Sequence, residues 1–76
     1  MDISQTLDVK GVLCPVPVIK ARQSITRVEV GEILEILATD PSTREDIPAW
    51  TKRSGHEIVT MKEEDEILKF YVRRRK

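Results

Sequence analysis

The chain has 76 residues, which predicts a single domain, 1–76, with one modest core. One cysteine and one histidine exclude an internal disulfide and give no Cys/His cluster for a structural metal, so no metal or other cofactor is expected. Thirteen basic and thirteen acidic residues cancel, so the net charge gives no reason to expect direct binding to nucleic acid.

The N-terminal residues Met1–Gln5 have neither a basic start nor an apolar run, so no secretory signal is expected. The longest mostly apolar run, Ile33–Ala38, is far too short to cross a bilayer, which predicts no membrane association. A free thiol in such a chain is typical of the reducing cytoplasm, and we expect a cytoplasmic protein.

The first predicted element is a short strand, Thr6–Lys10, in which apolar and polar side chains alternate before Gly11 breaks it. A helix is predicted from Pro15 to about Arg27. Its apolar residues recur at three- and four-residue spacing and line one face: Val18, Ala21 and Ile25.

Glu32–Thr39 alternates as a second strand and ends at the turn signal Asp40-Pro41. Ser42 begins a capping-box pattern, and Asp46 could instead cap a helix that carries Pro48 in its first turn. Both alternatives predict a second helix that runs to about Ser54 and stops at Gly55.

Two further strands, near Glu57–Lys62 and Ile67–Arg73, flank an acidic turn and form a hairpin. The order β-α-β-α-β-β, with right-handed crossovers, places both helices on one face of a mixed four-stranded sheet. Because the last strand is the most apolar, we expect it inside the sheet, in the order 1-2-4-3. The predicted fold is a two-layer α/β (α+β) sandwich whose other face meets solvent.

The segment that carries chemistry joins the first strand to the first helix and contains Cys14. Pro15 favours an extended conformation for Cys14, which predicts Cys14 as the N-cap and Pro15 as the first helical residue. Pro17 lies in the same turn, where its missing N–H is tolerated. The amide of Val16 and the helix dipole then predict a lowered pKa and a reactive thiolate at Cys14.

A lone cysteine is ordinarily a small buried hydrophobic residue, but the strand-to-helix position and the two prolines favour a functional thiol. A dithiol redox enzyme needs a second cysteine, and a Cys–His hydrolase would have only His56 as its base. One activated thiol can accept a group from one protein and hand it to another. Sulfane sulfur, held as a persulfide, suits that role.

The sequence resembles the TusA/SirA family of small sulfur carriers along nearly its whole length. The resemblance rests on a Cys-Pro-x-Pro motif after Gly11 and on further motifs in matching order: Leu7-Asp8, Asp40-Pro41, Asp46-Ile47-Pro48 and Gly55-His56-Glu57. It implies the β-α-β-α-β-β fold shared with the C-terminal domain of translation initiation factor 3. It also implies that Cys14 is the persulfide site and that Gly11, Pro15 and Pro17 form its scaffold.

The resemblance further implies two protein partners. A cysteine desulfurase or a rhodanese-like protein would donate the sulfur, and a relay protein would accept it, in some members for 2-thiouridine formation in tRNA. Such a protein is a sulfurtransferase-like carrier and not a self-sufficient enzyme. The alternative is a non-enzymatic module that binds RNA or a regulatory protein, and it rests on the shared fold and on the basic tail Arg73–Lys76.

Four other features have two readings. Asp8 could hydrogen-bond the loop near the sulfur or lie exposed on its strand. His56 could donate a proton to the sulfur or be an ordinary surface histidine. Trp50 fits the core side of the second helix, although its ring could border a docking surface. Arg73–Lys76 could bind phosphate or a partner, or serve only solubility.

Overall fold

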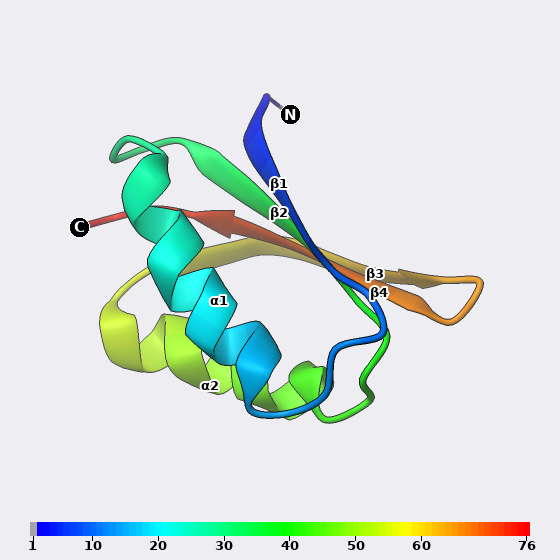
Figure 1. Cartoon of the computed structure of the whole chain (residues 1–76). Helices are drawn as coiled ribbons and strands as arrows, with labels where there is room; N and C mark the ends of the chain where they lie inside the picture. The colour runs from blue at the N-terminus through cyan, green and yellow to red at the C-terminus, as the bar shows by residue number, and fades with distance from the viewer. Residues whose placement is uncertain (1) are drawn as a thin grey trace.

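The computed structural model describes residues 2–76, which form one mixed sheet covered on one side by two helices (Figure 1). A short 3-10 turn, Ile25–Arg27, follows the first helix. The elements in chain order are β1 (Ile3–Val9), α1 (Val16–Ser24), β2 (Ile33–Ala38), α2 (Thr43–Ser54), β3 (Glu57–Glu64) and β4 (Ile67–Arg73).

The sheet has the order β1-β2-β4-β3, as the sequence predicts. β1 and β2 are parallel, and β4 is antiparallel to both of its neighbours. β4 lies inside the sheet because Leu68, Phe70 and Val72 bury one face against the helices, where each is at most 2% exposed. The predicted two-layer α/β sandwich is confirmed.

The core lies between the helices and the facing side of the sheet. Alternate residues of β2, Leu34, Ile36 and Ala38, are fully buried there, and Ile47 and Trp50 of α2 pack onto them. Trp50 is 4% exposed, so its place in the core is confirmed. Ala21, Ile25 and Val28 supply the contribution of α1 and its 3-10 extension, as their spacing predicts.

The other face of the sheet is partly closed by its own side chains. Tyr71 and Ile33 point away from the helices, yet they are only 8% and 4% exposed. The Glu35 carboxylate explains part of this burial, because it accepts hydrogen bonds from Tyr71 Oη (2.8 Å) and Thr6 Oγ1 (2.8 Å). These contacts tie β1, β2 and β4 together across that face, and the hydrogen bond to Glu35 raises the pKa of Tyr71.

The end of α2 follows the prediction closely. Gly55 has the left-handed φ of 80°, and the amide of His56 donates to the carbonyl of Thr51 at 3.0 Å. This pattern is a Schellman ending, which only a residue tolerant of positive φ supports at low cost. The start of α2 settles the two alternatives: the helix begins at Thr43, so the start at Asp46 is wrong and Pro48 lies inside the helix.

Within residues 2–76, no helix is both long and apolar enough to cross a membrane.

Phe70→Ala is expected to remove a large part of the protein's free energy of unfolding. Removing a fully buried phenylalanine costs about 3–5 kcal/mol, and a domain of this length has roughly 4–11 kcal/mol in total. Urea denaturation followed by circular dichroism measures the loss. Val30→Ala, at a loop position 61% exposed, is the control and should change the free energy of unfolding by about 0.5 kcal/mol or less.

Candidate functional site

Cys14 lies in the loop between β1 and α1, and its side chain is exposed. The predicted position is wrong by one residue: Pro15 occupies the N-cap, with φ −95° and ψ 9°, and the helix begins at Val16. The amide of Val16 donates to the carbonyl of Leu13 at 3.0 Å, so a tight turn precedes the helix. That amide is therefore taken by the backbone and does not point at the sulfur. Pro17 lies in the first turn, as expected.

Two carboxylates on the β2 side of the site hold Cys14. The amide of Cys14 donates to Asp40 Oδ2 at 2.6 Å, and its thiol donates to Asp46 Oδ2 at 3.2 Å. Asp40 follows β2 and Asp46 lies in the first turn of α2. Because β1 and β2 are parallel, with Val9 opposite Ala38, the segments after both strands meet at one edge of the sheet.

Gly11 fixes the start of the same loop. Its φ of 79° is in the left-handed region, and its amide donates to Thr39 Oγ1 at 2.8 Å, just beyond the end of β2. The expected scaffold role of Gly11 therefore has a concrete form in the structure: it turns the chain out of β1 and attaches it to the neighbouring loop.

The predicted activation of the thiol is wrong in direction. The hydrogen bond to Asp46, together with slight desolvation and the negative charges of Asp46 and Asp40, raises the pKa of Cys14 above its usual value. The expected effect of the helix dipole is not realised, because the Val16 amide is bonded to the Leu13 carbonyl whereas the Asp46 carboxylate contacts the thiol directly. Asp40 shifts the other way: hydrogen bonds from the amides of Ser42 and Cys14 lower its pKa.

The Ser42 hydroxyl opposes Asp46 in its effect on the thiol and lowers the pKa of Cys14. Ser42 is the N-cap of α2, but its side chain makes no capping hydrogen bond, so the predicted capping box does not form. Its oxygen is buried and has no hydrogen-bond partner among the described residues. The same hydroxyl also contributes to the lowered pKa of Asp40, so its rotating hydrogen can turn to either the carboxylate or the sulfur.

A hollow of about 220 Å³ opens beside the sulfur, between the two helices. Apolar groups of α1 and α2 line it together with one acidic and one basic side chain: Cys14, Pro15, Val18, Asp46, Ala49 and Arg53. A second hollow, of about 300 Å³, shares Val18 and Arg53 with the first and continues past Arg22 and Trp50. The sulfur thus lies at one end of a groove that follows the helices.

No group of three or more His, Cys, Asp or Glu side chains in residues 2–76 is arranged to hold a metal ion.

Asp8 and His56 do not join the site. Asp8 accepts a hydrogen bond from the amide of Lys10 at 3.0 Å, which supports its reading as an exposed strand residue. His56 comes two residues after Ser54, the last residue of α2, whereas Asp46 lies in the first turn, so roughly the length of the helix, about 12 Å from Asp46 to Ser54, separates them. Of the two readings for His56, the proton donor to the sulfur is wrong, because the histidine lies at the far end of α2 from Cys14.

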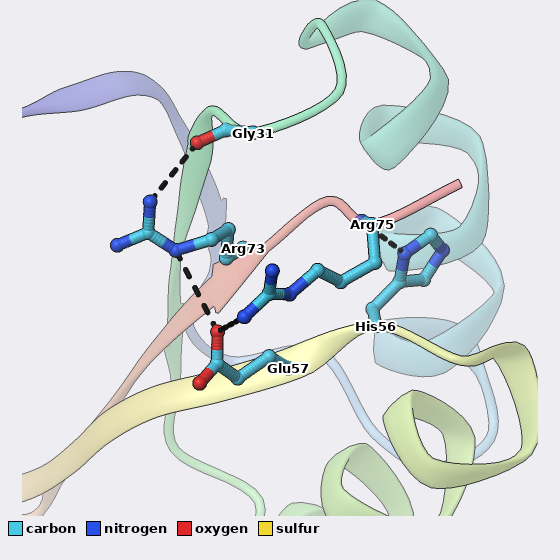
Figure 2. A network of polar contacts seen from close by, with 5 residues as sticks. All are labelled: Gly31, His56, Glu57, Arg73 and Arg75. Carbon is cyan, nitrogen blue, oxygen red and sulfur yellow. Dashed lines mark hydrogen bonds and ion pairs between the residues drawn. The ribbon is translucent and has the colours of Figure 1, made fainter.

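The basic tail is bound to the protein at that far end (Figure 2). The amide of Arg75 donates to His56 Nδ1 at 3.1 Å, and the Arg75 guanidinium meets Glu57 Oε1 at 2.6 Å. Arg73 pairs with the same carboxylate at 3.6 Å and donates to the carbonyl of Gly31. These contacts join β3, β4, the loop before β2 and the segment after α2, so the tail has a structural role that the sequence does not reveal.

Asp40→Asn is expected to weaken the attachment of the Cys14 loop, because an amide carries no charge and accepts backbone hydrogen bonds less strongly. Hydrogen exchange at the Cys14 amide, followed by NMR, should become faster, and the thermal midpoint should fall. Asp8→Asn removes a carboxylate that bonds only Lys10 and serves as the matched control. Unchanged protection of the Cys14 amide in Asp40→Asn would contradict this account of the loop.

Protonation of His56 is expected to destabilise the protein. Partial burial, followed by the positive charges of Arg74 and Lys76, lowers the pKa of His56, so the folded state binds this proton less readily than the unfolded state. Stability should therefore fall as the pH decreases below about 6.5, the unfolded value, and the loss should end below the folded pKa.

His56→Gln keeps an acceptor for the Arg75 amide and should remove most of this pH dependence between about pH 7 and pH 5. Urea midpoints across this range provide the measurement. An equal loss of stability in both proteins would show that other groups cause it.

Comparison with known proteins places the chain in a family. The family model described as sulfurtransferase TusA matches residues 5–74. A putative sulfur carrier protein of Halobacterium salinarum is 47% identical over 76 residues, covering 99% of this chain and 94% of its own. The sulfur carrier protein TusA of Allochromatium vinosum is 33% identical over 73 residues, covering 96% of each chain.

The solved structure of a SirA-like protein from Desulfitobacterium hafniense has the same fold, with a TM-score of 0.82 at 22% identity, and covers 95% of this chain and 99% of its own. The match of the family model over most of the chain, together with relatives of similar length, shows that this protein belongs to the TusA family.

Proposed function

We propose that this protein is a sulfur carrier that accepts sulfane sulfur as a persulfide on Cys14 and passes it to a downstream protein. The relatives named sulfur carrier proteins support the role. The observation that carries the assignment to Cys14 is its exposed thiol at the open end of the groove between the helices.

The transfer is a thiol–persulfide exchange. The Cys14 thiolate attacks the outer sulfur of a donor persulfide, a new S–S bond forms at Sγ, and the donor's S–S bond breaks. The donor leaves as a thiolate and takes up the proton that Cys14 gave up, so no net oxidation occurs and no redox partner is needed. Because the chain has one cysteine, the persulfide cannot resolve into an internal disulfide and is kept for the next protein.

Apolar side chains around the sulfur support protein partners. Leu13 is 71% exposed, Ile19 45% and Val16 38%, and all three lie within five residues of Cys14. Exposed apolar side chains next to an exposed thiol are typical of a surface that another protein covers. We propose a cysteine desulfurase or a rhodanese-like protein as the sulfur donor and a relay protein as the acceptor. We place the transfer in the cytoplasm, where thiols stay reduced, with tRNA thiolation as a destination of the sulfur.

The structure gives less support to the alternative, a module that binds RNA or a regulatory protein. That reading relies on the basic tail, and the guanidinium groups of Arg73, Arg74 and Arg75 all contact acceptors within the protein: Glu57, the carbonyls of Gly31, Val28 and Lys76. Glu57 partly neutralises the charges of Arg73 and Arg75, which reduces their attraction for phosphate.

Incubation with a cysteine desulfurase, its cofactor and free cysteine should add the mass of one or more sulfur atoms to the intact protein. The added mass should disappear after treatment with a reductant, because a persulfide is reducible. Cys14→Ser should gain nothing, since its hydroxyl does not take part in the exchange. An equal gain in Cys14→Ser, or no gain in the wild type with any donor of these classes, would contradict the proposed function.

A further inference from the structure

We propose that Asp46 and Ser42 are opposed positioning residues for the sulfur of Cys14. The Asp46 carboxylate holds the proton on the unloaded thiol and disfavours the departure of Sγ as a thiolate, whereas the Ser42 hydroxyl donates to that thiolate when sulfur is received or delivered. The inference deepens the proposed function and rests on it.

The Asp46 part rests on the direct contact at 3.2 Å between Sγ and Oδ2. An ionised carboxylate only accepts hydrogen bonds, so this contact requires a proton on the sulfur. In a persulfide, Sγ carries no proton and the hydrogen bond cannot form. When the outer sulfur is transferred, Sγ becomes a thiolate next to the Asp46 charge, and repulsion makes it a poorer leaving group. Asp46 therefore keeps the thiol unreactive and helps to retain the loaded sulfur.

The Ser42 part rests on a buried hydroxyl that lies near two acceptors, since it lowers the pKa of the Asp40 carboxyl as well as that of the Cys14 thiol. A serine at the N-cap normally bonds an amide of the first turn, but the side chain of Ser42 makes no such bond. Its oxygen is nevertheless buried and has no partner among the described residues. Since a buried hydroxyl is costly to leave unpaired and its hydrogen rotates freely, it can turn from the Asp40 carboxylate to the sulfur when the sulfur becomes a thiolate.

Two other charged groups face the sulfur, and neither duplicates these roles. Asp40 accepts from the backbone amide of Cys14 and acts on the thiol only through its charge. Arg53 lines the hollow about two turns along α2 from Asp46, and it makes no hydrogen bond or ion pair with Cys14. The part of α1 that lines the hollow is apolar, and Pro15 and Val18 bring no charge to it.

The first experiment measures how fast iodoacetamide alkylates unloaded Cys14 across pH, by intact mass. Asp46→Asn should lower the midpoint of the profile by about one pH unit and raise the rate at pH 7 about tenfold. Ser42→Ala should move the midpoint in the opposite direction. Asp46→Glu, which keeps a carboxylate, should stay closer to the wild type than Asp46→Asn.

Matched controls separate the local contacts from general charge effects. Glu45→Gln removes the neighbouring charge in the same turn of α2, and Ser4→Ala removes an exposed hydroxyl on β1. Both should leave the profile unchanged. A shift in Glu45→Gln equal to that in Asp46→Asn would overturn the proposal, as would shifts of the same sign in Asp46→Asn and Ser42→Ala. Urea midpoints verify that each variant is folded, and Ser42→Ala should lose little stability because no capping bond is removed.

The second experiment measures release of the sulfur. Cys14 is loaded with inorganic polysulfide, the excess is removed, and cyanide is added. Cyanide takes the outer sulfur as thiocyanate, the S–S bond breaks, and Sγ leaves as a thiolate. Asp46→Asn should release thiocyanate several-fold faster, and Ser42→Ala several-fold slower. Equal rates in all three proteins would overturn the proposal.

Neither experiment uses a protein donor, so a failure of this inference is distinguishable from a failure of desulfurase loading. If the alkylation and cyanide-release rates change in the expected directions but no donor protein loads Cys14, the roles of Asp46 and Ser42 are supported and the proposed function fails. If a donor protein loads Cys14 but the variants react like the wild type, the proposed function is supported and the roles of Asp46 and Ser42 are wrong.

Discussion

The Asp40 carboxylate is the contact on which the site depends. One of its oxygens accepts the amide of Cys14 at 2.6 Å, and the other accepts the amide of Ser42 at 3.0 Å. A single side chain therefore joins the loop that carries the sulfur to the N-cap of α2. Without this connection the thiol and the first turn of α2 would belong to two independent loops, and the distance between Sγ and Asp46 would not be defined.

The sheet makes this contact possible. β1 and β2 are parallel neighbours, so the loops that follow them leave the sheet at the same edge and in the same direction. Each loop then enters a helix on the same face. The sulfur is therefore presented at the ends of two strands and the beginnings of two helices, where backbone amides and short acidic side chains are concentrated. The fold gathers polar groups at these strand ends, and the side chains Asp40, Ser42 and Asp46 determine their effect on the thiol.

Much of the fold could be predicted from the sequence because it depends on regular patterns. The apolar content of Ile67–Arg73 indicated its place inside the sheet, and Gly55 marked the end of α2. The boundaries at the functional end were less predictable. Pro15 restricts several positions at once, and only the contact between Val16 and Leu13 in the folded chain shows that the helix starts one residue later than expected.

The position of the candidate thiol could be predicted from the sequence, but the direction in which its pKa shifts could not. Cys14 was identified from its own neighbours, but Asp40 and Asp46 lie 26 and 32 residues away, and a local reading does not weigh them. The parallel pairing of the first two strands was itself predicted. Because the segments after two parallel neighbours begin at the same end of the sheet, that pairing could have placed Asp40 and Ser42 near the sulfur. The tail was missed for a similar reason, because the partners of Arg75 are His56 and Glu57.

The strand order β1-β2-β4-β3 leaves β1 and β3 as the two edges of the sheet, and an edge with free backbone groups can recruit strands from other molecules. Along β3, the charged side chains of Lys62, Glu63 and Glu64 follow one another, and a register irregularity between Ile58 and Thr60 interrupts its regular pairing. Along β1, an irregularity lies between Ile3 and Gln5, and most side chains of that strand are polar. Both edges therefore oppose sheet extension, which allows a protein this small to keep an exposed apolar group around its sulfur without joining other copies edge to edge.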